Sequence, residues 1–253
     1  MINLRADINI KSIIKQLADI KDKQLPFATS LAINRTAQKV KEKEVKEIID
    51  VFDRPTPFTL NSVFIKPSNK NNLTAKVSIK DTAFNGAPAA KYLKAEIAGG
   101  ERRLKRYEVA LRSIGVLPDG YFTVPGEAAT MDVYGNMSVA QIRQILSFFK
   151  ANRDVGSISN STDKTRSKLA RSTKSRRGIS YFVGRGGNGK LPLGIWQKVF
   201  SNFGTAIRPI LIFVESARYE SIFDFEYVAM TTVDKEFDGE FIKAWEFAQR
   251  TAK

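Results

Sequence analysis

Apolar positions recur at helical spacing near both ends of the chain, which predicts a long helix at each end. The first runs from Pro26 to about Val51, with apolar positions at Leu31, Ala37, Val40, Val45, Ile48 and Ile49. In the second, apolar residues recur every four positions, at Phe225, Ala229, Val233, Phe237, Phe241 and Trp245. Such a stripe drifts by about 40° per step around a helix of 3.6 residues per turn. We therefore expect a break near Asp238-Gly239 or a second covering surface, such as another subunit.

The first residues of the chain follow a different pattern. Met1 to Ile10 alternates polar and apolar residues and lacks the apolar core of a signal peptide. Helical spacing follows from Ile8 to Gln24, until Leu25-Pro26 interrupts it and proline opens the next helix. No apolar run approaches the roughly 20 residues of a membrane span. These features predict a protein that is made in the cytoplasm and has no membrane partner.

Short segments with strand patterns lie between the two helices. Phe58–Lys66 and the alternating Leu73–Lys80 predict a hairpin with a polar turn between them. Further strands are expected at Ile179–Val183 and at Ile210–Val214, the latter with Pro209 at its first position. Leu191–Phe200 fits either a strand or a short helical turn.

Three further helices are expected within the middle of the chain, at Ala89–Ala98, Glu101–Ile114 and Met137–Ala151. Strands and helices are thus segregated rather than alternating, which predicts an α+β fold. In this fold an antiparallel sheet is packed by the long N-terminal and C-terminal helices. We expect residues 1–86 and 178–253 to form one discontinuous core domain, residues 87–151 a helical insertion, and residues 152–177 a basic flexible linker that orders only on assembly.

Composition removes many kinds of chemistry. The 253 residues include no cysteine and no histidine, which excludes disulfides, thiolate or imidazole metal ligands, cysteine nucleophiles and histidine bases. The chain holds 41 Lys and Arg against 26 Asp and Glu, a net charge of +15. An excess of this size favours an anionic partner or environment, most often nucleic acid. A basic protein that is simply soluble is the alternative.

Two motifs suggest catalysis or nucleotide binding, but neither is complete. Gly184 to Lys190 fits G-x-x-x-x-G-K, yet Leu191-Pro192 follows where a P-loop needs Ser or Thr and the start of a helix. A hairpin turn explains its glycines better. Acidic pairs such as Asp224 with Glu226 could support acid/base or two-metal chemistry, but on a surface helix they are usually solvated. We expect no enzymatic activity.

Basic residues form two clusters. Arg102, Arg103, Lys105 and Arg106 cannot share one helical face, so they do not form a single DNA-reading edge. The second cluster lies in the expected linker, where we select a set of residues for contact with DNA or another subunit: Lys164, Arg166, Lys168, Arg171, Lys174, Arg176 and Arg177. Without a zinc finger, helix-turn-helix or aromatic RNA-binding motif, the expected contact is non-specific and salt-dependent.

Several sequence blocks are distinctive: Pro26-Phe27-Ala28 with Leu31 to Ala37, Asp53 to Leu60, Gly99 to Glu108, Pro118 to Gly120, Asp132 to Met137 and Tyr181-Phe182-Val183. Together they resemble the minor tail protein Z family of tailed bacteriophages and prophages. The resemblance covers nearly the whole chain. The segment from Arg208-Pro209 into the last helix also looks like tail-completion or neck proteins more widely.

The resemblance implies a non-enzymatic virion protein, without a cofactor, that acts late in tail assembly. Such a protein sits at the head-tail junction as a ring around the DNA channel, a hexamer by family analogy, after a period in the host cytoplasm. Its partners would be other neck, head-completion, tail-tube or terminator proteins, with packaged double-stranded DNA nearby. The expected subunit interface is the apolar stripe of the last helix, at Phe225, Val233, Phe237, Phe241 and Trp245. A non-specific nucleic-acid-binding protein is the main alternative, followed by an enzyme that uses Asp224 or Glu226.

Overall fold

The chain forms two units, each of which combines helices with antiparallel strands. The computed structural model describes residues 18, 20–84, 86–152, 160–173, 177–185, 191–201 and 204–251. Unit 1 comprises Met1–Ile97 with Ser221–Lys253, and unit 2 comprises Ala98–Glu220. The order of elements and the antiparallel pairing confirm the α+β class. No helix in the described parts of the chain is long and apolar enough to cross a membrane.

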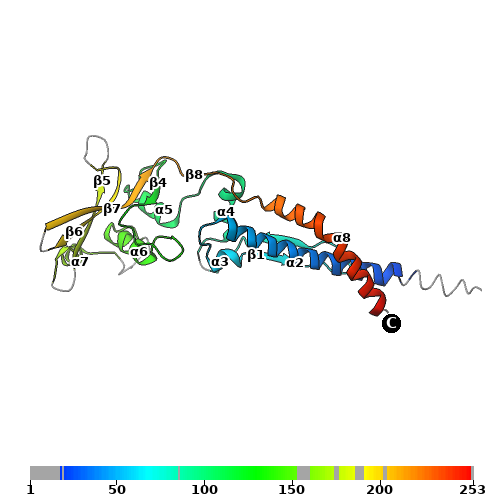
Figure 1. Ribbon diagram of the computed structural model, residues 1–253. Coiled ribbons are helices and arrows are strands. Elements are labelled where there is room, and N and C mark those ends of the chain that lie inside the picture. Colours follow the sequence, from blue (N-terminus) through cyan, green and yellow to red (C-terminus); the bar gives the residue numbers. More distant parts are fainter. Residues whose placement is uncertain are drawn as a thin grey trace, which may run out of the picture. The chain divides into compact units, whose positions relative to one another are not determined.

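Two 27-residue helices, α2 (Leu25–Val51) and α8 (Phe225–Thr251), form the body of unit 1 and lie side by side (Figure 1). A short π-helix, η1 (Ile20–Gln24), precedes α2. The two long helices are antiparallel, because the ring centroids of Phe27 and Phe247 lie 6.3 Å apart at one end. Near the middle, Lys39 Nζ lies 2.6 Å from Glu236 Oε2 and 2.8 Å from Glu240 Oε1. These ion pairs fix the register of the two helices.

The seam between α2 and α8 is built from residues spaced by four. On α2 the buried series is Ala28, Ala32, Thr36, Val40, Glu44 and Ile48, and on α8 it includes Thr232, Glu240, Ala244 and Ala248. When ridges with this spacing interdigitate, two helices pack while crossing at an angle. Both stripes drift in the same way, so α2 can follow the α8 stripe along its length. Helix α8 therefore continues through Asp238-Gly239 without the expected break.

This packing covers part of the expected subunit interface within the chain. Phe237, Phe241 and Trp245 pack against the alanines of the α2–α8 seam, within the same chain. Phe225 packs near Phe223 at the other end of α8. Val233 alone of the five is exposed, at 41%. Part of the α8 stripe is therefore covered by the N-terminal helix of the same chain.

A small hairpin and two short helices complete unit 1. Strands β1 (Val63–Lys66) and β2 (Lys76–Ile79) pair antiparallel, which confirms the expected hairpin. The first strand begins later than expected, because α3 (Pro57–Leu60) starts at Thr56, whose hydroxyl accepts from the Thr59 N–H. Helix α4 (Ala89–Ala98) follows. Hairpin residues such as Val63 close a second cluster over Ile48 and Phe223.

Glu44 is an unusual member of the α2–α8 seam. Its side chain is fully buried, and neither carboxyl oxygen has a hydrogen-bond partner among the described residues. Burial, reinforced by the nearby carboxylates of Glu47 and Asp224, raises the pKa of Glu44 to about 8. The folded chain therefore holds a proton that the unfolded chain releases above its ordinary pKa near 4.5. Stability from this group falls as pH rises from about 4.5 to about 8.

Replacing Glu44 with methionine is expected to raise the free energy of unfolding at pH 7 by about 2–3 kcal/mol, because it removes this buried acid at similar volume. The gain should shrink toward pH 5. Urea unfolding at pH 5 and pH 7, followed by the circular dichroism signal of the helices, measures this change in the free energy of unfolding. Glu44→Gln is the control, since it should lose the pH dependence while keeping a buried polar group. An equal gain at pH 5 and pH 7 would contradict the assigned pKa.

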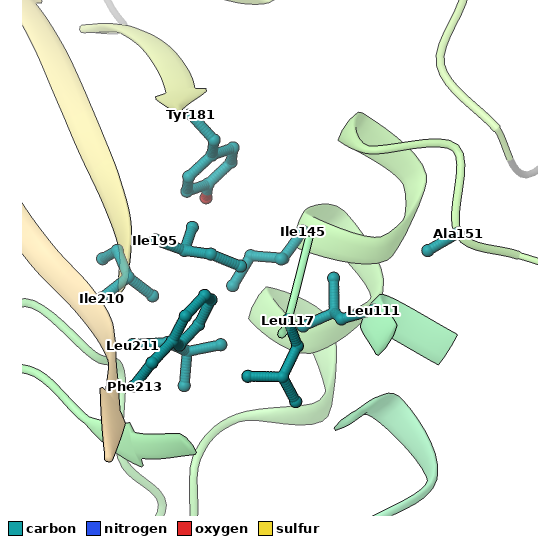
Figure 2. Packing of buried hydrophobic residues seen from close by; sticks show 9 residues of the cluster. All are labelled: Leu111, Leu117, Ile145, Ala151, Tyr181, Ile195, Ile210, Leu211 and Phe213. Carbon is teal, nitrogen blue, oxygen red and sulfur yellow. The ribbon is translucent and has the colours of Figure 1, made fainter. Parts of the chain in front are cut away.

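Unit 2 is organised by a four-stranded antiparallel sheet in the order β4-β7-β6-β5. Its strands are β4 (Phe122–Pro125), β5 (Gly178–Gly184), β6 (Gly194–Ser201) and β7 (Gly204–Val214). Helices α5 (Arg106–Ser113), α6 (Val139–Phe148) and α7 (Asp163–Ala170) belong to the same unit, and β3 (Gly100–Glu101) pairs with β8 (Arg218–Tyr219). In Figure 2 the side chains of Ile195 and Phe213 from the strands point toward Ile145 and Leu111 from the helices.

The boundaries of the units differ from the expected domains. Residues 87–151 do not form a separate helical insertion, because β4 pairs with β7 and α6 packs on the core of the same sheet. Residues 178–220 likewise belong to unit 2, not to a core shared with the long helices. The chain is still discontinuous, but the inserted unit spans residues 98–220 and carries the larger sheet.

Two local expectations also change. The segment expected at Leu191–Phe200 forms a strand from Gly194 onward, and β7 begins before Pro209, which lies in its interior. The β6–β7 register shifts between Ile195 and Trp196, and Trp196 pairs with Pro209, so a bulge accommodates the missing N–H. The expected flexible linker contains helix α7, over Asp163–Ala170. Residues 153–159 and 174–176 of that linker lie outside the described residues.

Candidate nucleic-acid interface

Positive charge is concentrated in unit 2. Between residues 143 and 208 the sequence holds 14 Lys and Arg but only 2 Asp and Glu. Many of these basic side chains are exposed, including Arg143, Lys150 and Arg208. By contrast, charges of both signs alternate along the exposed face of α2. The net charge of the chain therefore marks one region rather than the whole surface.

Helix α7 presents a basic ridge to solvent. Lys164, Lys168 and Arg171 are exposed and spaced by four and three residues, so they share one face of the helix and its C-terminal end. We call these three residues the basic ridge. The opposite face is half-buried and carries Leu169 and Ala170. A basic helix face of this kind can track a line of phosphates, and phosphate contacts alone carry no sequence information.

Contacts at its start hold α7 against α6. The Thr162 hydroxyl caps the helix by accepting from Thr165 N at 3.2 Å, and Ser161 N donates to Ser147 O at 3.0 Å. Arg166 does not point outward with the ridge, because its guanidinium lies 5.1 Å from the centroid of the Phe148 ring. Arg166 is thus a packing residue, which corrects its expected role in DNA or subunit contact.

Gly178, the first residue of β5, lies against the end of α7. A Cβ at this position would overlap the carbonyl oxygen of Ala170, and it would lie 2.9 Å from the carbonyl carbon of Arg171. Because both of these are backbone atoms, neither can move away by a side-chain rotation. The glycine therefore allows the close approach that places the basic ridge beside the edge of the sheet.

Gly178→Ala is expected to loosen α7 and to cost about 1–3 kcal/mol in the stability of unit 2, as overpacking does. Hydrogen exchange of the amides in residues 163–170 should accelerate while exchange in α8 stays unchanged. Gly239→Ala is the matched control, because nothing lies within 4 Å of a Cβ added there. Unchanged protection of α7 in the Gly178 variant would contradict this role.

Strand register brings other basic residues to the same end of the sheet. Arg177 directly precedes β5, and Lys198 pairs with Ser180 across β5 and β6. Lys198 also pairs with Ile207, next to Arg208 on β7. The Lys198 ammonium lies 5.0 Å from the centroid of the Phe182 ring. Lys198 and Arg208 are not among the residues predicted from sequence, since only strand pairing relates them to the linker.

The expected set of contact residues is therefore only partly brought together. Lys164, Lys168, Arg171 and Arg177 lie on α7 or between it and β5 and are exposed. Lys174 and Arg176 lie outside the described residues.

The other basic cluster has a structural role at Arg102. This guanidinium donates to both carboxyl oxygens of the fully buried Glu108, at 2.7 and 2.6 Å. Glu108 also accepts from Lys105 N and from the N–H and hydroxyl of Thr123. Burial alone would raise the pKa of Glu108, but these hydrogen bonds outweigh it and hold the pKa below its usual value. We call this network the Arg102–Glu108 clasp, which ties the start of α5 to β4.

The acidic residues considered for catalysis have ordinary structural surroundings. Asp224 Oδ1 accepts from Tyr227 N at 3.0 Å, as a carboxylate does at the start of a helix, and Glu226 is exposed. Within the described ranges, no group of three or more acidic residues is placed to hold a metal ion. Most of the glycine-rich motif, residues 186–190, falls outside those ranges.

Comparison with protein families, curated proteins and solved structures gives no match to this chain.

Proposed function

We propose that this protein is a structural component of a tailed bacteriophage particle, acting in tail completion at the head-proximal end of the tail. In this proposal several copies form a ring around the DNA channel and join the tail to the head. The resemblance of its sequence blocks to the minor tail protein Z family suggests this role. The observation that carries it is the basic region of unit 2, which has few acidic residues and no base-reading motif.

The basic region of unit 2 has properties that the wall of a DNA channel needs. DNA must pass it in any sequence and without tight binding, so phosphate attraction without base readout is suitable. The rigid attachment of α7 through Gly178 and Phe148 would keep the basic ridge in place during passage. The Arg102–Glu108 clasp lies in the family-like block Gly99 to Glu108 and would preserve unit 2 as a wall element.

The proposal is tested by locating the protein in particles of the phage or prophage that encodes it. Gold-labelled antibody should mark the head-tail junction of intact virions. Disrupting the coding sequence should leave filled heads and finished tails that do not join. Finding the protein only in the cytosol of infected cells, with normal particles formed in its absence, would overturn the proposal.

A non-specific nucleic-acid-binding protein is the second candidate, favoured by the same concentration of positive charge. It predicts duplex binding that persists at moderate salt, together with absence from particles. The two candidates share the basic ridge, so DNA binding alone does not separate them. Incorporation into virions does.

A further inference from the structure

Lys150 adopts a backbone conformation that favours glycine. Its φ is 59°, and among the described residues only Arg54 shares a positive φ without being a glycine. A side chain in this left-handed region is crowded by its own backbone, so glycine is the usual residue there. Conformations of this kind gather at functional sites, where the side chain is needed for something other than the local fold.

The left-handed conformation of Lys150 belongs to the end of α6. Lys150 N donates to Ser147 O at 3.2 Å, and Ala151 N donates to Leu146 O at 2.8 Å. These two bonds form a Schellman motif, in which the residue after the helix cap takes a positive φ. Ala151 then enters the core of unit 2. The motif uses only the backbone of residue 150, so it gives no reason for a lysine there.

Helix α5 ends in the same motif, but with a glycine. Gly115 N donates to Arg112 O and Val116 N donates to Leu111 O, both at 3.0 Å, and the φ of Gly115 is 72°. The two motifs lie in the same unit and differ in the residue at the left-handed position. A glycine at position 150 would therefore keep the end of α6 and relieve its backbone.

The surroundings of the Lys150 side chain are those of a solvated group. The side chain is 53% exposed, and its Nζ lies 3.9 Å from Oδ1 of Asp163, whose side chain is 86% exposed. A pair this open contributes little to stability, because water and salt screen it. The same oxygen has a second cation 3.6 Å away, at Arg166 Nη1. The pair with Asp163 is therefore too weak to explain a lysine in place of glycine.

The position of Lys150 extends the basic ridge beyond the start of α7. Asp163 is the first residue of α7, and Lys164 of the basic ridge follows it. The eight residues of α7 rise by about 12 Å, which corresponds to about three or four phosphates along one DNA strand. Asp163 is also the only acidic residue among the described residues between 143 and 208. Lys150 thus lies beside the one carboxylate of the basic region, at the opposite end of α7 from Arg171.

We propose that Lys150 binds a backbone phosphate of duplex DNA, and that this phosphate takes the place of the Asp163 carboxylate. The carboxylate and the phosphate attract the same ammonium group, so Asp163 keeps Lys150 beside the basic ridge and also limits how tightly DNA binds. An exchangeable contact of this kind suits DNA that must move past the protein. This inference rests on the proposed function and deepens it by naming a phosphate contact outside the segment expected from sequence.

Replacing Lys150 with glycine separates the role of the side chain from that of the backbone. The variant should unfold thermally at or above the midpoint of the natural chain, because glycine suits the left-handed position. Its affinity for duplex DNA should fall about eightfold at 0.1 M salt, and the slope of log affinity against log salt should fall by about 0.9. Lys150→Arg should keep both values, since it keeps the charge. Fluorescence anisotropy of a labelled duplex measures them.

Arg54→Gly is the matched control for this substitution. Arg54 has a φ of 49° and lies in unit 1, so its replacement also removes one positive charge and relieves a left-handed residue, away from the basic region. It should lower the affinity for duplex DNA by less than about twofold, through net charge alone. Inorganic phosphate at constant ionic strength should not displace the duplex from the natural chain, whereas it would if Lys150 belonged to a site for free phosphate.

Asp163→Asn tests the exchange between carboxylate and phosphate. It should raise the affinity of the natural chain for duplex DNA, and it should raise it less in a chain that also carries Lys150→Gly. An equal gain in the two backgrounds would contradict the exchange.

The phosphate contact is overturned if Lys150→Gly binds duplex DNA as the natural chain does, or if Lys150→Arg loses as much affinity as Lys150→Gly. If the glycine variant does not fold, Lys150→Asn tests the same loss of charge, since asparagine also tolerates the left-handed conformation. Unchanged affinity in that variant would overturn the contact equally.

These results are separable from the proposed function. If replacing the basic ridge weakens duplex binding and Lys150→Gly does not, only the inference on Lys150 is wrong. If Lys150 contributes to duplex binding but virions lack the protein, only the proposed function is wrong.

Discussion

Replacing Lys164, Lys168 and Arg171 together with glutamine is expected to weaken binding of the whole chain to duplex DNA by about 100- to 500-fold at 0.1 M salt. Each phosphate contact releases about 0.9 counterion, which corresponds to roughly an eightfold gain in affinity at this salt concentration. Losing three contacts should also lower the slope of log affinity against log salt by about 2.7. Fluorescence anisotropy with duplexes of two unrelated sequences measures both quantities.

A variant with the same loss of charge elsewhere is the control for this experiment. Lys43, Lys46 and Lys94 are exposed residues of unit 1, outside the basic region. Their replacement by glutamine should change affinity only through net charge, by a few-fold. Equal losses in the two triple variants would mean that total charge, rather than the basic ridge, determines binding.

Replacing Glu108 with alanine is expected to destabilise unit 2 by about 3–5 kcal/mol, because it leaves the Arg102 guanidinium without its buried partner. The side chain of Arg102 is 11% exposed, so water cannot replace the lost carboxylate fully. The Thr123 N–H and hydroxyl lose their acceptor as well. Urea unfolding of a Trp245→Phe chain measures the effect, since Trp196 of β6 then reports on unit 2 alone.

The double variant Arg102→Met with Glu108→Leu separates loss of the pair from an unpaired charge. It should recover part of the lost stability, because both partners of the buried pair are replaced by apolar groups. The natural clasp should also weaken in acid, since a depressed carboxyl pKa stabilises the fold above its unfolded value and that stabilisation is lost as the pH falls through the folded pKa. A Glu108→Ala chain as stable as the natural one would contradict the role of the clasp.

The long helices could be predicted from sequence because their apolar spacing is strong over many turns. The packing of these helices against each other could not be predicted in this way, because the drifting apolar stripe of α8 is matched only by the equally drifting stripe of α2. The small residues Ala28 and Ala32 gave little hydrophobic signal, yet they allow the close approach of α8. The fold thus covers part of the α8 stripe with a helix whose own sequence gave little sign of that contact.

The candidate site was predictable as a basic segment but not as a surface. Helix α7 has eight residues and little apolar character, so its sequence resembles a flexible linker. Its order depends on tertiary contacts, such as the fit of Gly178 against Ala170. Arg166 looked like its basic neighbours, although it packs on Phe148. Composition indicates how much charge a segment carries, whereas the direction in which each basic side chain points depends on the surrounding fold.

The two crossings between the units have a consequence for how this chain can be divided. The Ser221 hydroxyl donates to Ile97 O at 2.6 Å, and the N–H groups of Ile222 and Phe223 donate to Glu96 O at 3.0 and 3.2 Å. The ends of the inserted unit are thus pinned next to each other on unit 1. A few residues of tight turn could replace residues 98–220 without separating the long helices, which makes the sheet-bearing unit an exchangeable insertion.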